Sequence, residues 1–340
     1  MRRSWFRLRV DSSMIEGVPA DGPISKRLFF VVCKDLPGIT IYDADTGRRV
    51  AQAITPGKIN PHEAAFSRDG RSVYVPIYGT SGVGKPGDDG HTFHVFDSLT
   101  GTELASLDTG QYRRPHCVTV GQESGLVYAS AELAESLILI DPAQPAIVGA
   151  IPTGSNTSHM FALTRDESKA YVSNVRSKNI AVLDVESRRL EQTIPTEGEN
   201  QRMTLSPDER WFVTNLGPAG KVAFYRTADN ELDFTVPVNG TPFVAKFSSD
   251  GRFLYCAGFA GPRKLAIWKI DVPTREVVAS TSEGLGQDPG CLEVNPFTGT
   301  VYVTDQPSST VLQIDPDAWT VAGVIRTEKT PDAMGFVELR

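Results

Sequence analysis

The sequence has little of what several large classes of protein need. Its 340 residues include only five histidines and four cysteines, and no apolar run reaches the roughly 18 residues that span a bilayer. The cysteines lie far apart and form no CxxC pair, which favours buried free thiols over a zinc finger or disulfides. A net charge of −7 argues against a dedicated nucleic-acid binder. We therefore expect no nucleic acid and no membrane among the partners.

The first ten residues are basic but lack the apolar core of an export signal. Met-Arg-Arg-Ser-Trp-Phe-Arg-Leu-Arg-Val is not followed by an apolar stretch of about 7–15 residues, which a secretory signal requires. We therefore expect residues 1–25 to form a disordered N-terminal extension, and we expect a cytoplasmic location.

One short step recurs seven times, a polar loop that turns into an apolar strand. It is clearest over residues 60–66, Asn-Pro-His-Glu-Ala-Ala-Phe. The seven copies end in these apolar anchors: Phe66, Val120, Leu163, Leu205, Phe247, Val294 and Phe336. Successive anchors lie 54, 43, 42, 42, 47 and 42 residues apart, close to the roughly 40–45 residues of a four-stranded propeller blade. Seven anchors predict seven blades.

Each unit also carries turn and strand signals at fixed places. Ser-x-Asp-Gly-like turns follow the anchor, and an aromatic, β-branched strand comes next, as in Tyr-Val-Ser-Asn at 171–174, Phe-Val-Thr-Asn at 212–215 and Tyr-Val-Thr-Asp at 302–305. A further strand ends in aspartate in most units: Asp43, Asp97, Asp184, Asp271 and Asp315. Aspartate stabilises turns by accepting backbone hydrogen bonds, so we assign these residues to structure rather than catalysis.

The two ends of the repeat region complement each other. Residues 26–56 contain the second, third and fourth strands of a unit, whereas the strand of Phe336 is a lone first strand. We therefore predict a single all-β domain over residues 26–340. It is a seven-bladed β-propeller with four antiparallel strands per blade, closed by one C-terminal strand that joins three N-terminal strands.

The strand and turn motifs resemble those of the bacterial YVTN-type seven-bladed β-propellers, which include lactonase-like proteins. The resemblance rests on the motifs at 171, 212 and 302 and covers roughly residues 26–340. It implies the propeller fold. It leaves the activity open, because such propellers include lactonases, metal enzymes, dehydrogenase subunits and interaction scaffolds. Many members of this group are exported.

Three consecutive units place a histidine at the same position of the repeat. These are His62, His116 and His159, and the fourth unit has Gln201 there. The first strand of a blade lines the central channel, so the four side chains should form an arc around one channel mouth. Three imidazoles with an open position can hold Zn, Cu or Fe, which predicts a divalent transition metal at the three histidines. The alternatives are ligand binding without metal, or histidines that cap loops.

Further candidates lie around the same mouth. Glu63 is a candidate general base and Arg202 a candidate anion clamp, although strand alternation points both away from the channel and favours a salt bridge between blades. A unit about 12 residues longer than its neighbours inserts residues 79–91, whose His91 is a candidate catalytic or ligand-binding residue on a lid. Arg114 and Asp332 are candidate ligand-binding residues.

These features favour a protein that binds a small polar or anionic molecule at the channel mouth. The leading interpretation is a metal-dependent hydrolase of a lactone or ester, with metal-activated water as the nucleophile. The alternatives are a non-enzymatic scaffold that binds a protein partner and a cofactor-dependent oxidoreductase, for which no sequence motif is visible.

Overall fold

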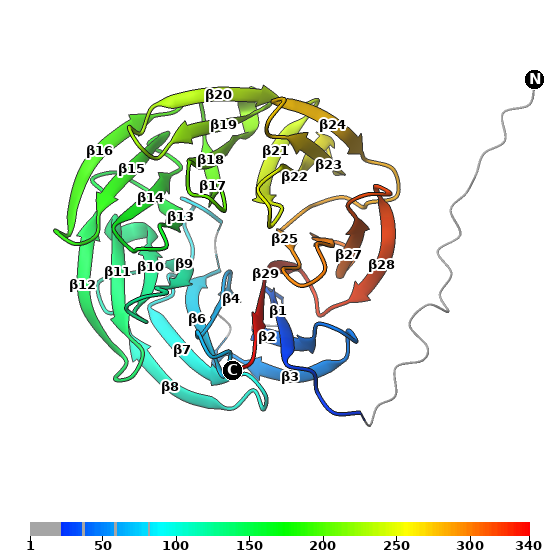
Figure 1. Ribbon diagram of the computed structural model, residues 1–340. Coiled ribbons are helices and arrows are strands. Elements are labelled where there is room, and N and C mark those ends of the chain that lie inside the picture. Colours follow the sequence, from blue (N-terminus) through cyan, green and yellow to red (C-terminus); the bar gives the residue numbers. More distant parts are fainter. Residues whose placement is uncertain (1–21, 36–37, 58–59, 81) are drawn as a thin grey trace, which may run out of the picture.

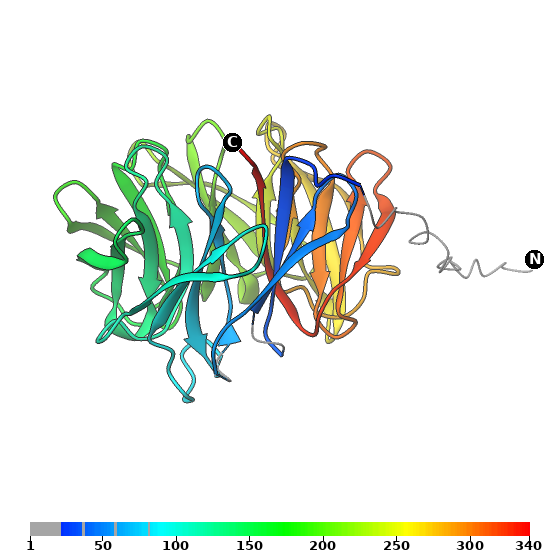
Figure 2. The ribbon, with the colours of Figure 1, turned by 90° about the horizontal axis from the view of Figure 1, so that it is seen from below.

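The computed structural model describes residues 22–35, 38–57, 60–80 and 82–340. They form seven small antiparallel sheets around a central axis, a ring in Figure 1 and a flat disc from the side in Figure 2. The predicted seven-bladed propeller is confirmed. Of the predicted N-terminal extension, residues 1–21 lie outside the described residues. Ser25, the last residue of that predicted extension, contacts the propeller: its backbone N–H donates to the Asp43 carboxylate, 2.6 Å away.

The first four blades run in chain order around the ring. Blade 1 combines β1 (Arg27–Cys33), β2 (Gly38–Asp43), β3 (Arg49–Ile54) and β29 (Pro331–Glu338). Blade 2 has a divided inner strand, β4 (Asn60–Pro61) and β5 (Ala65–Phe66), then β6 (Ser72–Gly79), β7 (Thr92–Asp97) and β8 (Glu103–Asp108). Blade 3 contains β9 (Pro115–Val120), β10 (Val127–Ala131), η1 (Glu132–Ala134), β11 (Ser136–Asp141) and β12 (Ala146–Pro152). Blade 4 contains β13 (Ser158–Leu163), β14 (Lys169–Asn174), β15 (Asn179–Asp184) and β16 (Arg189–Pro195).

The last three blades repeat the same order from the channel outward. Blade 5 contains β17 (Asn200–Leu205), β18 (Trp211–Leu216), η2 (Gly217–Ala219), β19 (Lys221–Arg226) and β20 (Leu232–Pro237). Blade 6 contains β21 (Thr241–Phe247), β22 (Phe253–Gly261), β23 (Lys264–Asp271) and β24 (Glu276–Thr281). Blade 7 contains β25 (Leu292–Val294), β26 (Val301–Asp305), β27 (Thr310–Asp315) and β28 (Thr320–Arg326).

The hydrophobic core consists of seven clusters, each lying between two adjacent blades. The cluster between blades 7 and 1 packs Phe29 and Tyr42 against Tyr302. Each large side chain buried in this way stabilises the fold by about 1.5–3 kcal/mol. Because every blade covers its neighbours, the ring needs all seven clusters to bury its apolar strands.

The ring closes through the C-terminal strand, as predicted. β29 pairs antiparallel with β1 along its length, from Arg27 opposite Glu338 to Cys33 opposite Pro331. This pairing leaves neither strand as an open edge of an unfinished sheet, and open edges invite pairing with other chains. The two views agree that β29 lies at the channel, beside β1 (Figures 1 and 2).

The repeated aspartates act as turn residues, which confirms their structural interpretation. Asp97 Oδ1 accepts from the backbone N–H groups of Leu99, at 3.0 Å, and Thr100, at 2.8 Å. The corresponding side chains each accept at least one such bond: Asp43, Asp184, Asp271 and Asp315. All four cysteines are buried and free, also as predicted.

The inner strands carry a β-bulge at the position of the repeated histidine. In blade 4, Ser158 pairs with Asn174 and Phe161 pairs with Val172, so three steps along β13 match two along β14. Blades 3 and 5 show the same one-residue excess, and the registers of β29 and β21 also shift at the corresponding point. A bulge breaks the alternation of side chains and can aim two successive residues to one side.

A hydroxyl group on the second strand satisfies the backbone groups that the bulge leaves unpaired. Ser173 Oγ accepts from Met160 N, at 3.1 Å, and donates to Met160 O, at 3.0 Å. Thr304 Oγ1 accepts from the N–H groups of Gly290 and Cys291, at 2.9 and 2.8 Å. These hydroxyls belong to the third residue of the Tyr-Val-Ser-Asn type motif, which explains why that position is Ser or Thr.

The hydroxyl contribution can be measured with a near-isosteric change. Thr304→Val leaves two buried N–H groups without their acceptor, so we expect the free energy of unfolding to fall by about 1–3 kcal/mol. Thr320→Val on the exposed strand β28 is the matched control and should change it by less than about 0.5 kcal/mol. Urea unfolding measures both, and equal effects would contradict the role of the hydroxyl.

Candidate functional site at the channel mouth

The structure brings the three repeated histidines into one row. Their ring centroids are 5.2 Å apart between His62 and His116 and 4.0 Å apart between His116 and His159. All three side chains are buried. Each stands near the start of an inner strand, in blades 2, 3 and 4, so the repeat position alone predicted their proximity.

Tyr78, which the sequence did not single out, completes this histidine row. Its ring centroid lies 4.3 Å from that of His62 and 4.8 Å from that of His116. Its hydroxyl donates to Glu132 Oε2, 2.6 Å away, and that carboxylate is fully buried. Tyr78 lies near the end of β6, an aromatic strand like many others in the chain, so no sequence signal separates it from packing residues.

The three imidazoles are uncharged at neutral pH. Burial is the largest cause: it lowers the pKa of His159 to about 3, and together with nearby cations it lowers the pKa of His62 and His116 well below their usual value. His159 Nδ1 donates to the Gln201 carbonyl, 2.9 Å away, whereas His116 Nδ1 has no partner among the described residues. An unpartnered buried ring nitrogen requires a specific explanation.

The depressed pKa values predict a pH dependence of stability. The unfolded chain binds protons at these histidines below pH 6.5, whereas folded His159 stays neutral down to about 3, so the free energy of unfolding falls as the pH drops through this window. Between pH 6.5 and 5 each such histidine should cost up to about 2 kcal/mol. Denaturant titrations of wild type and His159→Gln should show a shallower decline in the variant. Identical slopes would contradict the buried neutral state.

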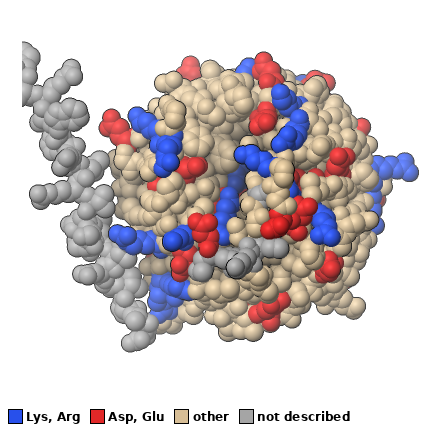
Figure 3. Space-filling view, turned by 180° about the vertical axis from the view of Figure 1, so that it is seen from behind, with Lys and Arg blue, Asp and Glu red and all other residues tan. Residues whose placement is uncertain are grey.

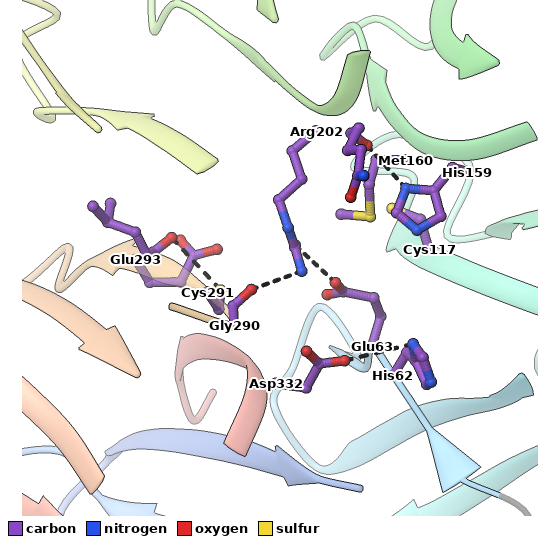
Figure 4. A network of polar contacts seen from close by, with 12 residues as sticks. His62, Glu63, Cys117, His159, Met160, Arg202, Gly290, Cys291, Glu293 and Asp332 are labelled. Carbon is purple, nitrogen blue, oxygen red and sulfur yellow. Dashed lines mark hydrogen bonds and ion pairs between the residues drawn. The ribbon is translucent and has the colours of Figure 1, made fainter. Parts of the chain in front are cut away.

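Arg202 crosses the channel and joins three blades (Figure 4). Its side chain extends from β17 in blade 5. Nη1 donates to Glu63 Oε1 of blade 2, at 2.9 Å, and Nη2 donates to the Gly290 carbonyl of blade 7, at 2.8 Å. Burial raises the pKa of Glu63 to about 7, and the Arg202 charge opposes this shift. The salt bridge between blades expected for this pair is present. It lies inside the channel and not outside it, because the inner strands are bulged rather than regular.

Other charged pairs surround this bridge. Lys246 lies 2.7 Å from Glu293, and Lys34 lies 2.8 Å from Asp332 Oδ2. Asp332 also accepts from Gln306 and lies 3.5 Å from His62 Nδ1, so this predicted residue does belong with the histidine row. A cavity of about 40 Å³ lies beside Arg202 and Lys246, room for a few water molecules.

The remaining predicted residues are placed differently. His91 is half-exposed, and its Nδ1 lies 3.1 Å from Asp108 Oδ1. Its described partner is therefore Asp108 and not a residue of the histidine row. Arg114 is buried between Asp89 and Glu132, at 2.6 and 3.2 Å. Gln201 contributes its backbone carbonyl to His159. Lys34, Lys246 and Glu132 were not predicted, because long charged side chains at loop and strand ends carry no repeat signal.

The face that carries the starts of the inner strands is seen in Figure 3. Lys and Arg side chains lie in and around a central hollow on this face, with acidic side chains beside them.

The metal prediction stays open at this site. Neutral imidazoles are suitable ligands, yet the part of the chain that the structure describes contains no group of three or more His, Cys, Asp or Glu side chains placed to hold a metal ion. The described part of the chain contains no helix with the length and hydrophobicity of a membrane-spanning segment.

The bridge across the channel can be tested by a double-mutant cycle. Either Arg202→Met or Glu63→Leu alone leaves one buried charge without its partner, so each should lower the free energy of unfolding by about 3–5 kcal/mol. The double variant should lose less than the sum of the two single effects. Arg226→Met removes an exposed ion pair and should cost less than about 1 kcal/mol. Additive single effects would show that the two side chains do not interact.

Comparison with known proteins shows relatives by fold only. No protein-family model matches the chain, and no characterised protein matches it by sequence search. The periplasmic gluconolactonase of Pseudomonas aeruginosa superposes with a TM-score of 0.72 at 16% identity, covering 92% of this chain and 100% of its own. A candidate 6-phosphogluconolactonase from Bacteroides uniformis gives 0.71 at 15%, covering 92% and 99%. A dihydro-heme d1 dehydrogenase gives 0.67 at 15%, covering 95% and 78%.

Fold and site together define a class of protein. The chain is a seven-bladed β-propeller with a charged channel and a row of neutral histidines at one mouth. Among solved structures it shares the fold of the gluconolactonase-type propellers named above.

Proposed function

We propose that this propeller binds a small anionic molecule of the sugar-acid type at the channel mouth and hydrolyses its lactone or ester. The histidine row carries the proposal. Three buried, unprotonated imidazoles lie side by side, and His116 Nδ1 has no partner within the described residues. Buried polar groups normally find partners, so such a row is expected where a ligand completes it. The two gluconolactonase-type neighbours support the substrate class.

The charges around the row suit an acyl-transfer reaction. Lys34 is a quarter exposed, and its ion pair with Asp332 fixes its ammonium beside the carboxylate that also approaches His62. A positioned cation stabilises the negative charge that develops on a carbonyl oxygen under attack, and it does so more strongly where water is excluded. The same cation attracts a carboxylate-bearing substrate.

In the proposed reaction His62 positions the attacking water. Its unprotonated ring nitrogen accepts a hydrogen bond from water, while Asp332, 3.5 Å from Nδ1, fixes the orientation of the ring. The water oxygen bonds to the acyl carbon, the bond from that carbon to the ring or ester oxygen breaks, and a water proton ends on the departing oxygen. The products are a hydroxy acid, or an acid and an alcohol, and no oxidant or reductant is consumed.

A lactonase assay with histidine variants tests this function. The purified protein should hydrolyse glucono-δ-lactone or related lactones faster than the spontaneous reaction, and His62→Gln and His116→Gln should lower kcat/KM by about 10²–10⁴-fold. Val321→Ala on the outer strand of blade 7 should leave kcat/KM unchanged. Elemental analysis for Zn, Cu and Fe, before and after incubation with each metal, tests the metal prediction separately.

Two outcomes would contradict the proposal. One is turnover no faster than the spontaneous rate for every lactone and ester tested. The other is turnover that survives both histidine substitutions. A protein partner that binds wild type and both variants equally, in the absence of turnover, would favour an interaction scaffold instead.

A further inference from the structure

A second pocket lies on the histidine face, between the insertion of blade 2 and the loops of blades 3 and 4. It has a volume of about 330 Å³ and is lined by Gly84, Lys85, Pro86, Arg114, Leu133, Asn156, Thr157 and Arg176. This volume falls at the lower end of the range for small-molecule sites, about 300–1,000 Å³. Three of its eight lining residues are cations, and none is an acid.

The buried carboxylate of Glu132 is bonded to two residues that line this pocket, Gly84 and Arg114. Its Oε1 accepts from Gly84 N, at 3.0 Å, and from Arg114 Nη1, at 3.2 Å, while its Oε2 accepts from Tyr78. The insertion is therefore attached to blade 3 through one fully buried side chain. Because Tyr78 packs on two rings of the histidine row, the same carboxylate connects the pocket with the candidate functional site.

Gly84 and Arg176, which both line the pocket, lie in direct contact. Arg176 from blade 4 donates through Nη2 to the Gly84 carbonyl. Gly84 has a positive φ of 62°, and a Cβ there would lie 2.2 Å from the Arg176 Nε. Thr157, a β-branched residue with φ of 64°, forms the floor beside Asn156. Positive φ at a β-branched residue is strained, and such strain concentrates at functional sites.

The cations of the pocket differ in their compensation. Arg114 is neutralised by Asp89 and Glu132. In the described part of the chain, Lys85 and Arg176 form no ion pair, although both line the same pocket. Both side chains are exposed and line one pocket, so an anion bound there can contact both. Guanidinium and ammonium groups are the usual partners of phosphate and carboxylate.

From this geometry we infer that the pocket binds the phosphate group of a small phosphorylated molecule. Lys85 and Arg176 contact the phosphate oxygens, and the amide of Asn156 is placed to donate beside them. The inference goes beyond the proposed function, because the pocket is a separate anion site on the same face and none of the three histidines lines it. The phosphate site itself does not depend on any turnover at the histidines.

Binding of inorganic phosphate tests the pocket directly. Isothermal titration calorimetry at constant ionic strength should give a saturable isotherm with wild type. The double variant Lys85→Met/Arg176→Met should bind phosphate at least tenfold more weakly, because both contacts to the anion are removed. Both side chains are exposed, so thermal unfolding should confirm an intact fold.

A charge-matched control separates a site from general attraction. Lys178→Met/Lys264→Met removes two exposed cations outside the pocket, one in the turn before β15 and one at the start of β23, and should change the dissociation constant less than twofold. Equal weakening by both double variants would overturn the inference, as would unchanged binding in the pocket variant or no saturable binding by wild type.

A second pair of probes tests whether the pocket recognises the phosphate group of an organic acid. We expect 6-phosphogluconate to bind wild type at least tenfold more tightly than gluconate, and the difference should vanish in the pocket variant. Equal affinity of wild type for the two acids would overturn the assignment to phosphate. Phosphate binding without any lactone turnover would leave the pocket standing and reject the proposed hydrolysis, whereas turnover without phosphate binding would do the reverse.

Discussion

The structure depends on one extra residue at the start of its inner strands. A propeller buries its strands between blades, and a regular inner strand would turn alternate side chains away from the channel. The bulge interrupts this alternation where the strand enters the channel, so the side chain of Arg202, which follows the repeated histidine position, can point into the channel. The hydroxyl groups of Ser173, Thr214 and Thr304 supply hydrogen bonds at the interruption. The same bulge therefore shapes the inner strands and positions side chains of the candidate site.

The channel lowers the cost of burying titratable side chains in two ways. The histidines are kept neutral, which removes the cost of a buried charge and leaves polar ring nitrogens near the mouth. Arg202 and Glu63 stay in contact across the axis, and the Gly290 carbonyl supplies a further hydrogen bond. A buried ion pair contributes little net stability compared with an apolar replacement. Its presence at the centre of the ring is better understood as a means of fixing a polar channel than as a source of stability.

Periodicity predicted much of the fold and part of the site. The anchors, the aspartate turns and the closing strand followed from spacing, because each recurs at a fixed place in the blade. The histidine row followed for the same reason. The roles of Tyr78 and Glu132 could not be predicted in this way. They depend on contacts between side chains of neighbouring blades, and a repeat pattern does not specify those contacts. The position of Arg202 inside the channel depended on the bulge, which hydrophobic alternation does not reveal.

Ring closure also has a consequence for how the chain is made. Of the propeller strands, β1 emerges first from the ribosome and β29 last, yet each is the other's neighbour. Until β29 is synthesised, blade 1 exposes an unpaired strand edge and its share of the cluster with blade 7. Intermediate blades can pack as they appear, but the ring cannot close. The longest-lived folding intermediate should thus be an open crescent, which chaperones would need to shield from other nascent chains.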